Sequence, residues 1–200
     1  MTGYSDRIHH ALAFADKHHD REVRKGTRSP YFTAPANLAV MLTRYAQDEP
    51  TVVAGILRQT VEDYLRDGLS ADAVHERLAD KFGAPTVDVL LAAVPRRVDD
   101  DGVELSHEEQ KGDLLDRLAA GPDAARWVAA AHEVHEASAL LADLRRTSFP
   151  ESVWQRVSEG REARLRWYAQ VTARLLAAGV DAAPVAELAS AADALGATAH

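Results

Sequence analysis

Hydrophobic residues recur three and four positions apart along most of the chain, with charged residues between them. This spacing places the apolar side chains on one face of a helix and is typical of amphipathic helices. Alanine, leucine, arginine and glutamate, all good helix formers, dominate these segments, and no stretch reads convincingly as a strand. We therefore expect an all-α protein with helices over residues 5–19, 35–47, 51–66, 70–82, 84–94, 107–119, 123–146, 151–178 and 182–197.

Capping residues mark several of the expected helix starts. Ser5, Thr51 and Ser70 each precede a segment with helical periodicity, where a hydroxyl oxygen can accept a hydrogen bond from a first-turn amide. Ser106, followed three residues later by Glu109, is a capping-box pattern. These residues predict where four of the helices begin.

Two polar stretches interrupt the helical pattern. Residues 20–35 (DREVRKGTRSPYFTAP) contain Gly26, Pro30 and Pro35, which break helicity. Residues 95–106 (PRRVDDDGVELS) are polar and acidic, and we expect a loop there that is the best candidate for a mobile segment.

The segment REARLRWYAQVTARLL has an apolar stripe with arginines opposite it. The stripe suits either a helix that closes the bundle or a homodimer surface, and the pattern does not separate the two. The stripe consists of Leu165, Tyr168, Val171 and Leu175. The three tryptophans fall at helical positions, where core packing is expected: they are Trp127, Trp154 and Trp167.

Composition and charge narrow the classes of function. The net charge of −8 argues against a general nucleic-acid binder, because such proteins carry basic surfaces, although local basic clusters could still bind an anionic small molecule. The chain has no cysteine, so disulfides and thiolate metal sites are excluded. No apolar run approaches the roughly 20 residues that span a bilayer, and residues 1–10 show no apolar signal segment. We expect a cytoplasmic protein without a membrane partner.

Five segments carry a resemblance to a known family: ALAFADKHHDREVRKGTRSPYFTAP, AGILRQTVEDYL, ADKFGAPTVDVLLAAV, AAHEVHEASALLADLRR and VWQRVSEGREARLRWYAQV. In this order the chain resembles the RelA/SpoT-type HD-domain hydrolases, which include small stand-alone alarmone hydrolases, over residues 4–178. The resemblance implies an all-α HD-domain helical bundle over residues 1–180, followed by a short C-terminal helix and tail over 181–200. It also implies a metal-dependent phosphohydrolase that removes pyrophosphate from the 3′ position of guanosine tetraphosphate.

The four positions that bind the family's metal, commonly manganese, carry other residues here. Where the family has a histidine, this chain has Ala34. Where the family has the His-Asp pair of its name, this chain has Arg58 and Gln59, and where the family has an aspartate, it has His132. Alanine has no donor atom, arginine repels a cation, and glutamine offers only a neutral oxygen. We therefore predict that the metal is lost and that the chain has no cofactor.

Residues around the metal positions are retained. Glu62 and Asp63 match the acidic pair that positions or activates the attacking water in the family. Arg24 and Lys25 match the nucleotide-contacting segment, and Tyr31 stands at the family's tyrosine. The resemblance thus implies a catalytic pair without its metal beside part of a substrate-binding pocket.

Two neighbouring motifs match only in part. His19 is retained from a motif in which glycine and glutamine have become Arg21 and Glu22. His135 matches a histidine that supports the metal site, and the asparagine after it is Glu136 here.

Arg58 has two readings. It stands four residues before Glu62, so the two side chains share a helix face and could form an ordinary exposed ion pair. Given the resemblance, Arg58 faces the former metal cavity, and we predict that its guanidinium replaces the cation and pairs with Glu62 or Asp63.

The histidines leave a relocated metal site open. His132 and His135 are three residues apart and could bind one ion, although glutamate-rich helices with histidines are commonly just solvated. The pairs 9–10 and 18–19 are adjacent, so we expect structural or surface histidines that do not share a helix face.

From the resemblance we predict a catalytically degenerate hydrolase relative that acts as a nucleotide-binding or regulatory protein, with a guanosine polyphosphate or another phosphorylated small molecule as its partner. Two alternatives stay open. The bundle could be a scaffold for a protein partner or a homo-oligomer. It could also be an active phosphohydrolase or another enzyme with a rebuilt site that uses Glu62, Asp63, His132 and His135.

Overall fold

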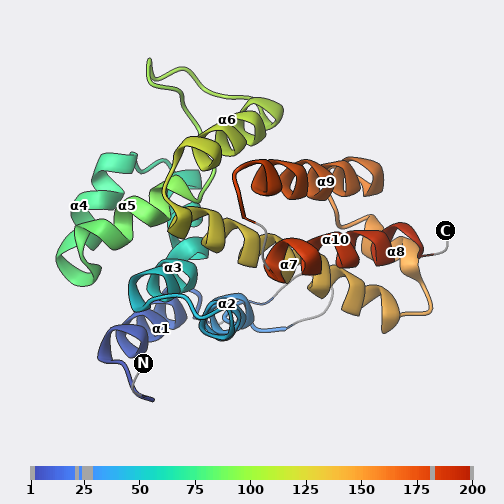
Figure 1. The fold of residues 1–200 in the computed structure, drawn as a ribbon, viewed down its shortest axis with the longest axis horizontal. Helices are drawn as coiled ribbons and strands as arrows, with labels where there is room; N and C mark the ends of the chain where they lie inside the picture. Colours follow the sequence, from blue (N-terminus) through green and yellow to red (C-terminus); the bar gives the residue numbers. More distant parts are fainter. Residues whose placement is uncertain (1–2, 21–22, 24–28, 181–182, 199–200) are drawn as a thin grey trace.

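The computed structural model describes residues 3–20, 23, 29–180 and 183–198. These residues form ten helices and no strand, which confirms the expected all-α fold (Figure 1). In chain order the helices are α1 (Asp6–His18), α2 (Thr33–Arg44), α3 (Glu49–Arg66), α4 (Ala71–Phe82), α5 (Ala84–Ala92), α6 (His107–Ala120), α7 (Asp123–Arg145), α8 (Pro150–Trp154), α9 (Arg161–Ala177) and α10 (Ala183–Gly196).

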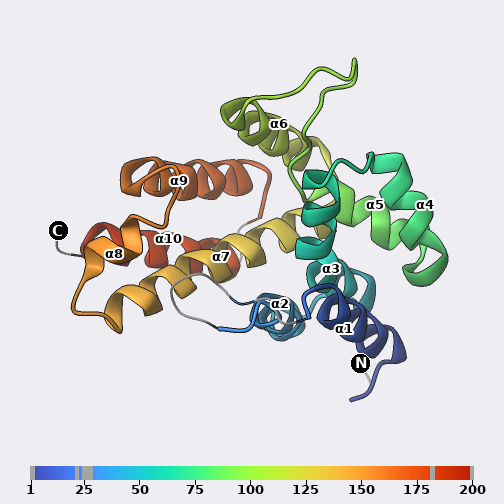
Figure 2. The same cartoon turned by 180° about the vertical axis from the view of Figure 1, so that it is seen from behind.

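The long helix α7 runs through the middle of the molecule (Figures 1 and 2). Helices α1 to α5 lie toward one end of the molecule and α8 to α10 toward the other, and α7 contacts elements of both groups. Small side chains let neighbouring helices approach α7 closely, since alanine adds little width to a helix. The buried alanines of α7 are Ala125, Ala129, Ala130, Ala131 and Ala137.

Helix α3 is the most deeply buried element among the N-terminal helices. Thirteen of its 18 residues are buried, because α1, α2, α4, α5 and α7 surround it. Its sequence is apolar over most of the circumference, as expected for a helix in the core of a bundle. Two charged residues, Arg58 and Asp63, are buried with the apolar ones, and they mark the region of the candidate site.

The contact between α2 and α3 depends on a glycine. Gly55 faces Leu42, and a Cβ atom at residue 55 would overlap the Leu42 Cδ1 atom. Leu42 is itself fully buried, so it has little room to move aside. The absence of a side chain at Gly55 therefore sets how closely α2 packs on the helix that carries the site.

The caps of three helices are confirmed. The hydroxyls of Ser5 and Ser70 accept first-turn amide hydrogen bonds, and Ser106 forms a full capping box with Glu109. The predicted cap at Thr51 is wrong: α3 begins earlier, at Glu49, and Asp48 caps it by accepting from the Thr51 amide at 3.0 Å. Pro50 lies in the first turn, where its missing amide hydrogen costs nothing.

The helix expected over residues 151–178 is interrupted. The short helix α8 ends at Trp154, and α9 begins at Arg161 after Gly160, whose φ of +80° favours glycine. The apolar stripe of α9 faces the protein's own core, since Tyr168, Val171 and Leu175 are almost fully buried. Helix α9 therefore closes the bundle against α6, α7 and α10.

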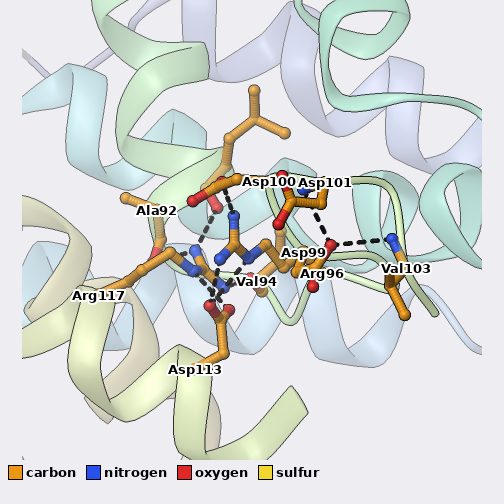
Figure 3. A network of polar contacts seen from close by, with 10 residues as sticks. Ala92, Val94, Arg96, Asp99, Asp100, Asp101, Val103, Asp113 and Arg117 are labelled. Atoms are coloured by element: carbon orange, nitrogen blue, oxygen red, sulfur yellow. Dashed lines mark hydrogen bonds and ion pairs between the residues drawn. The ribbon is translucent and has the colours of Figure 1, made fainter. Parts of the chain in front are cut away.

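Residues 95–105 form a hydrogen-bonded turn where the sequence predicted a loop. The Asp99 amide donates to the Val103 carbonyl oxygen at 2.9 Å, and the Asp99 carboxylate accepts from the Val103 amide at 2.8 Å (Figure 3). The Arg97 guanidinium donates to the Arg66 carbonyl oxygen at 2.8 Å, which ties the turn to the end of α3. Aspartates favour such turns because their carboxylates accept hydrogen bonds from nearby amides.

Two arginines hold the base of this turn against α6 (Figure 3). Arg96 donates to the carboxylates of Asp113 at 2.8 Å and Asp100 at 2.6 Å. Arg117 donates to the other oxygen of Asp113 at 2.8 Å and to the Val94 carbonyl oxygen at 2.7 Å. One carboxylate therefore organises both guanidinium groups, and the turn is fixed to one side of the candidate site.

Trp154 and Trp167 are buried, as expected of core residues, and Trp127 is half-buried. Helix α10 also contributes fully buried residues, Leu188 and Leu195, to the same core. None of the helices in the described ranges combines the length and apolar character needed to cross a membrane.

We expect Gly55→Ala to lower the free energy of unfolding by about 1–3 kcal/mol, because the added methyl group overpacks the α2–α3 contact. The matched control is Gly112→Ala in α6, where nothing lies near the new methyl group. That variant should be more stable by about 0.5–1 kcal/mol, since alanine favours a helix over glycine. Urea unfolding of both variants tests the pair, and equal effects would contradict the packing explanation.

Candidate active-site cavity

Two adjoining hollows open on the core residues of α3 and α7. The α6 hollow, of about 880 Å³, lies among α3, α6, α7, α9 and the 95–105 turn. The α2 hollow, of about 1030 Å³, lies among α2, α3 and α7. The residues that line both hollows are Glu62, Arg66, His132, Ser158 and Arg164. These shared residues border both hollows, and the two adjoining hollows are together called the cavity.

Most of the residues singled out in the sequence line this cavity. Arg58 faces the α6 hollow, while Ala34, Gln59 and Tyr31 face the α2 hollow. The structure therefore brings together the four positions that match the family's metal ligands, with His132 lining both hollows. Arg24 and Lys25, expected to contact a nucleotide, lie outside the described residues, as do Arg21 and Glu22.

Arg58 is held inside the cavity by Glu62. Its side chain is only 4% exposed, and its Nη1 atom lies 2.7 Å from Glu62 Oε2, one helical turn away. The Arg58 end of the pair is buried, so the interpretation as an ordinary exposed ion pair is wrong. The Nε atom of Arg58 has no hydrogen-bond partner among the described residues, although it is buried. One donor of the guanidinium is therefore left without a hydrogen bond in the described structure.

Gln59 and Asp63 form a second pair on the same helix. Gln59 Nε2 donates to Asp63 Oδ1 at 3.1 Å, and Arg66 Nη2 lies 2.6 Å from the same oxygen. Arg58 therefore pairs with Glu62 and leaves Asp63 to other partners. Glu62 reaches the cavity, whereas Asp63 lies behind it against His18 and His19. The matched acidic pair of the sequence is divided between two environments.

The donor atoms at the four positions that match the family's metal ligands do not suit that metal. Ala34 has no donor, Arg58 presents a cation already paired with Glu62, and the Gln59 amide nitrogen is bonded to Asp63. Only the His132 imidazole is a good donor for a transition metal. A site of this kind depends on the number and charge of its ligands, so these residues provide no basis for a metal-activated water.

Burial and the Arg58 cation both act on two neighbouring residues of α7. Burial lowers the pKa of His132 well below its ordinary value, and the Arg58 cation lowers that pKa further. Burial raises the pKa of Glu133 from 4.5 to about 7, although Arg58 and Arg164 oppose the rise. His132 is therefore neutral at neutral pH, and Glu133 is only partly ionised.

Sequence reasoning missed Glu133 and Arg164. Glu133 is buried, with its Oε2 atom unpartnered among the described residues, and Arg164 Nε lies 2.9 Å from Glu159. Glutamates near histidines on a helix suggested a solvated face, yet Glu133 points inward. The one feature of the sequence that could have pointed to Glu133 is that it follows His132, which stands at a metal-ligand position of the family.

Tyr31 closes one side of the α2 hollow. Its ring lies 5.2 Å from the ring of His19, measured between centroids. Burial raises the pKa of Tyr31, and the negative charge of Asp63 raises it further. The phenol is therefore a neutral hydrogen-bond donor at neutral pH.

A group of side chains that could hold a metal ion does occur in the described part of the chain, but not at His132 and His135, where the sequence left a relocated site open. The one group of three or more ligand-type residues with converging donor atoms there is His18, His19 and Asp63. His132 and His135 do not belong to it; the His135 ring lies 3.9 Å from Glu136 instead.

Comparisons with known proteins agree with the resemblance. Residues 11–118 match the HD domain. The guanosine-3′,5′-bis(diphosphate) 3′-pyrophosphohydrolase of Aquifex aeolicus (strain VF5) is 31% identical over 80 residues, which are 40% of this chain and 10% of that protein. The GTP pyrophosphokinase of Myxococcus xanthus is 26% identical over 113 residues, which are 56% of this chain and 14% of that protein. The chain therefore spans only a small part of these relatives.

Two solved structures share the fold. A protein from Listeria monocytogenes EGD-e superposes with a TM-score of 0.63 at 20% identity, covering 83% of this chain and 97% of the other. A metazoan orthologue of SpoT, described as hydrolysing ppGpp and playing a role in starvation responses, superposes with a TM-score of 0.69 at 20% identity. That match covers 96% of each chain.

The raised pKa of Glu133 predicts a pH-dependent stability. Its folded-state pKa of about 7 exceeds the ordinary 4.5, so the folded state favours the protonated form. Stability is then greatest below the ordinary pKa and falls as the pH rises through about 7. We expect Glu133→Gln to gain stability relative to the wild type between about pH 5 and pH 8, by up to about 3 kcal/mol.

Urea unfolding at both pH values measures this gain. The control is Glu162→Gln in α9, whose side chain is 92% exposed and should give the same difference from the wild type at both pH values. A Glu133→Gln variant that tracks the wild type across the range would show that Glu133 ionises normally.

Proposed function

The chain belongs to the HD-domain family and is related to the RelA/SpoT-type hydrolases, and we propose that it is a relative that has lost the metal and the hydrolytic reaction. In this proposal the protein retains a binding cavity for a guanosine polyphosphate or another phosphorylated small molecule. The protein then binds this ligand without hydrolysing it and has a regulatory role.

The observation that carries the proposal is the Arg58–Glu62 pair, which is buried at its Arg58 end. A metal centre at this point would need a ligand at Arg58, and a guanidinium next to the ion would repel it. The guanidinium instead balances the Glu62 carboxylate, which would otherwise face the cavity without a cation. A hydrolase that relies on a metal-activated water loses its nucleophile when that exchange occurs.

Cationic side chains on the cavity walls support a phosphorylated ligand. Arg164 lines both hollows with its side chain 25% exposed, so it is accessible from either side. Arg66 lines both hollows as well, and Lys111 lines the α6 hollow. Guanidinium groups match phosphate oxygens with two parallel hydrogen bonds, which favours phosphates over other anions.

The binding proposal predicts that guanosine tetraphosphate binds in the presence of a chelator, without divalent ions. We expect Arg164→Ala to weaken this binding at least about tenfold, because a charge-assisted hydrogen bond contributes about 1.5–3 kcal/mol. The matched control is Arg166→Ala, two residues further along α9, whose side chain is 68% exposed and lines neither hollow. Isothermal titration calorimetry measures the affinity of the wild type and of both variants for guanosine tetraphosphate.

Binding that Arg164→Ala and Arg166→Ala weaken equally would place the ligand elsewhere. If guanosine tetraphosphate and simpler nucleotides all fail to bind, the result favours the alternative in which the bundle is a scaffold for a protein partner or a homo-oligomer. Hydrolysis that survives the chelator and is abolished by Glu62→Ala would establish a metal-free enzyme and overturn the proposal.

Restoring the family's ligands should restore the metal. We expect the combined variant Ala34→His, Arg58→His, Gln59→Asp and His132→Asp to bind manganese, because the cavity already brings these four positions together. Elemental analysis after manganese loading and gel filtration gives the readout. A folded variant without added manganese would show that the four positions do not correspond to the family's ligands.

A further inference from the structure

The end of α1 brings two adjacent histidines together. His18 is the last residue of the helix, and His19 is its C-cap, with φ −99° and ψ 20°, outside the helical conformation. Because the backbone turns there, the rings lie with centroids 4.7 Å apart. The expectation that adjacent histidines point to different sides fails here, since it assumed that the helix continues.

Both rings face the same carboxylate oxygen of α3. Asp63 Oδ2 lies 3.7 Å from His18 Nε2 and 3.7 Å from His19 Nδ1. All three donor atoms fall within 4.8 Å of one another. Ligands of a tetrahedral zinc ion, bound at about 2.0–2.1 Å, stand roughly 3.4 Å apart. A small movement of the side chains therefore brings this cluster to metal-binding distances.

The carboxylate is already oriented for such a role. Its other oxygen, Oδ1, accepts from Gln59 at 3.1 Å and pairs with Arg66 at 2.6 Å, so Oδ2 is turned toward the two rings. On the far side of the His19 ring, Nε2 lies 3.5 Å from the Thr60 hydroxyl oxygen, at the outer limit of a hydrogen bond. Contacts of this kind behind the ligands fix their orientation in metal sites.

The helix end favours a cation at this cluster, while the Arg66 guanidinium on Asp63 Oδ1 opposes it. The C-terminal end of a helix carries a partial negative charge, and His18 and His19 stand at that end of α1. His19 and Asp63 are buried, while the His18 side chain is 24% exposed and gives access from solvent. Two imidazoles with one carboxylate form a donor set that suits zinc and related transition metals.

We propose that His18, His19 and Asp63 form a binding site for one divalent transition-metal ion of the zinc type, separate from the degenerate centre at Arg58. The ion would join the end of α1 to α3 behind Tyr31, since Tyr31 packs on His19. Such a site stabilises the fold by linking two helices and needs no role in hydrolysis. It is independent of the proposed nucleotide binding.

Titration of the metal-stripped protein with Zn²⁺ tests the site, with Co²⁺ absorption as a report on the coordinating atoms. We expect one equivalent to bind and to raise the melting temperature. His18→Ala, at the most exposed of the three positions, should weaken binding at least about tenfold, as should Asp63→Asn. His9→Ala, an exposed histidine of the same helix, is the matched control and should bind like the wild type. Circular dichroism checks that each variant is folded.

The outcomes separate this site from the proposed function. If the wild type binds no zinc, or if His18→Ala and Asp63→Asn bind it normally, the site is overturned while the nucleotide-binding proposal stands. If binding disappears instead in His132→Ala, the ion occupies the former metal centre. That result would contradict both proposals.

Discussion

The ion pair between Arg58 and Glu62 is the constraint around which the cavity is arranged. It lies on α3, a helix buried around most of its circumference, so its cation has little water to solvate it. Such a charge is tolerated only with a partner and hydrogen bonds. Glu62 supplies the partner, and the positive field of Arg58 reaches His132 and Glu133 on α7. Burial and the Arg58 cation together therefore determine the charge state of these two residues on the inner wall.

Helical periodicity and capping residues predicted the fold class and most helix positions. The failures have local causes: Asp48 outcompeted Thr51 as a cap, and Gly160 broke a helix whose apolar stripe continues through Tyr168. The resemblance singled out Ala34, Arg58, Gln59 and His132, and all four line the cavity, because helix register carries over between related folds. Asp63 lies behind the cavity. The resemblance could not predict that Glu133 points inward, since burial depends on helices distant in sequence.

At the candidate metal cluster, the position of a helix end decides which side chains can meet, and the sequence does not give that position exactly. The rule that adjacent residues face apart holds inside a helix, but His19 lies just beyond the end of α1. The exact end residue therefore decides whether His18 and His19 can share Asp63. Glu62 and Asp63, adjacent within α3, obey the rule: one reaches the cavity and the other lies behind it. Glu62 and Asp63, which are adjacent in the sequence, therefore lie in two different environments.

A double-mutant cycle between Arg58 and Glu62 tests most directly whether the guanidinium has taken the place of the cation. The free energies of unfolding of Arg58→Met, Glu62→Gln and the double variant give the coupling energy of the pair. A cation that neutralises the cavity should give a coupling of at least about 1.5 kcal/mol, within the range for residues in contact. A coupling below about 0.5 kcal/mol, as for exposed helical pairs, would contradict the account.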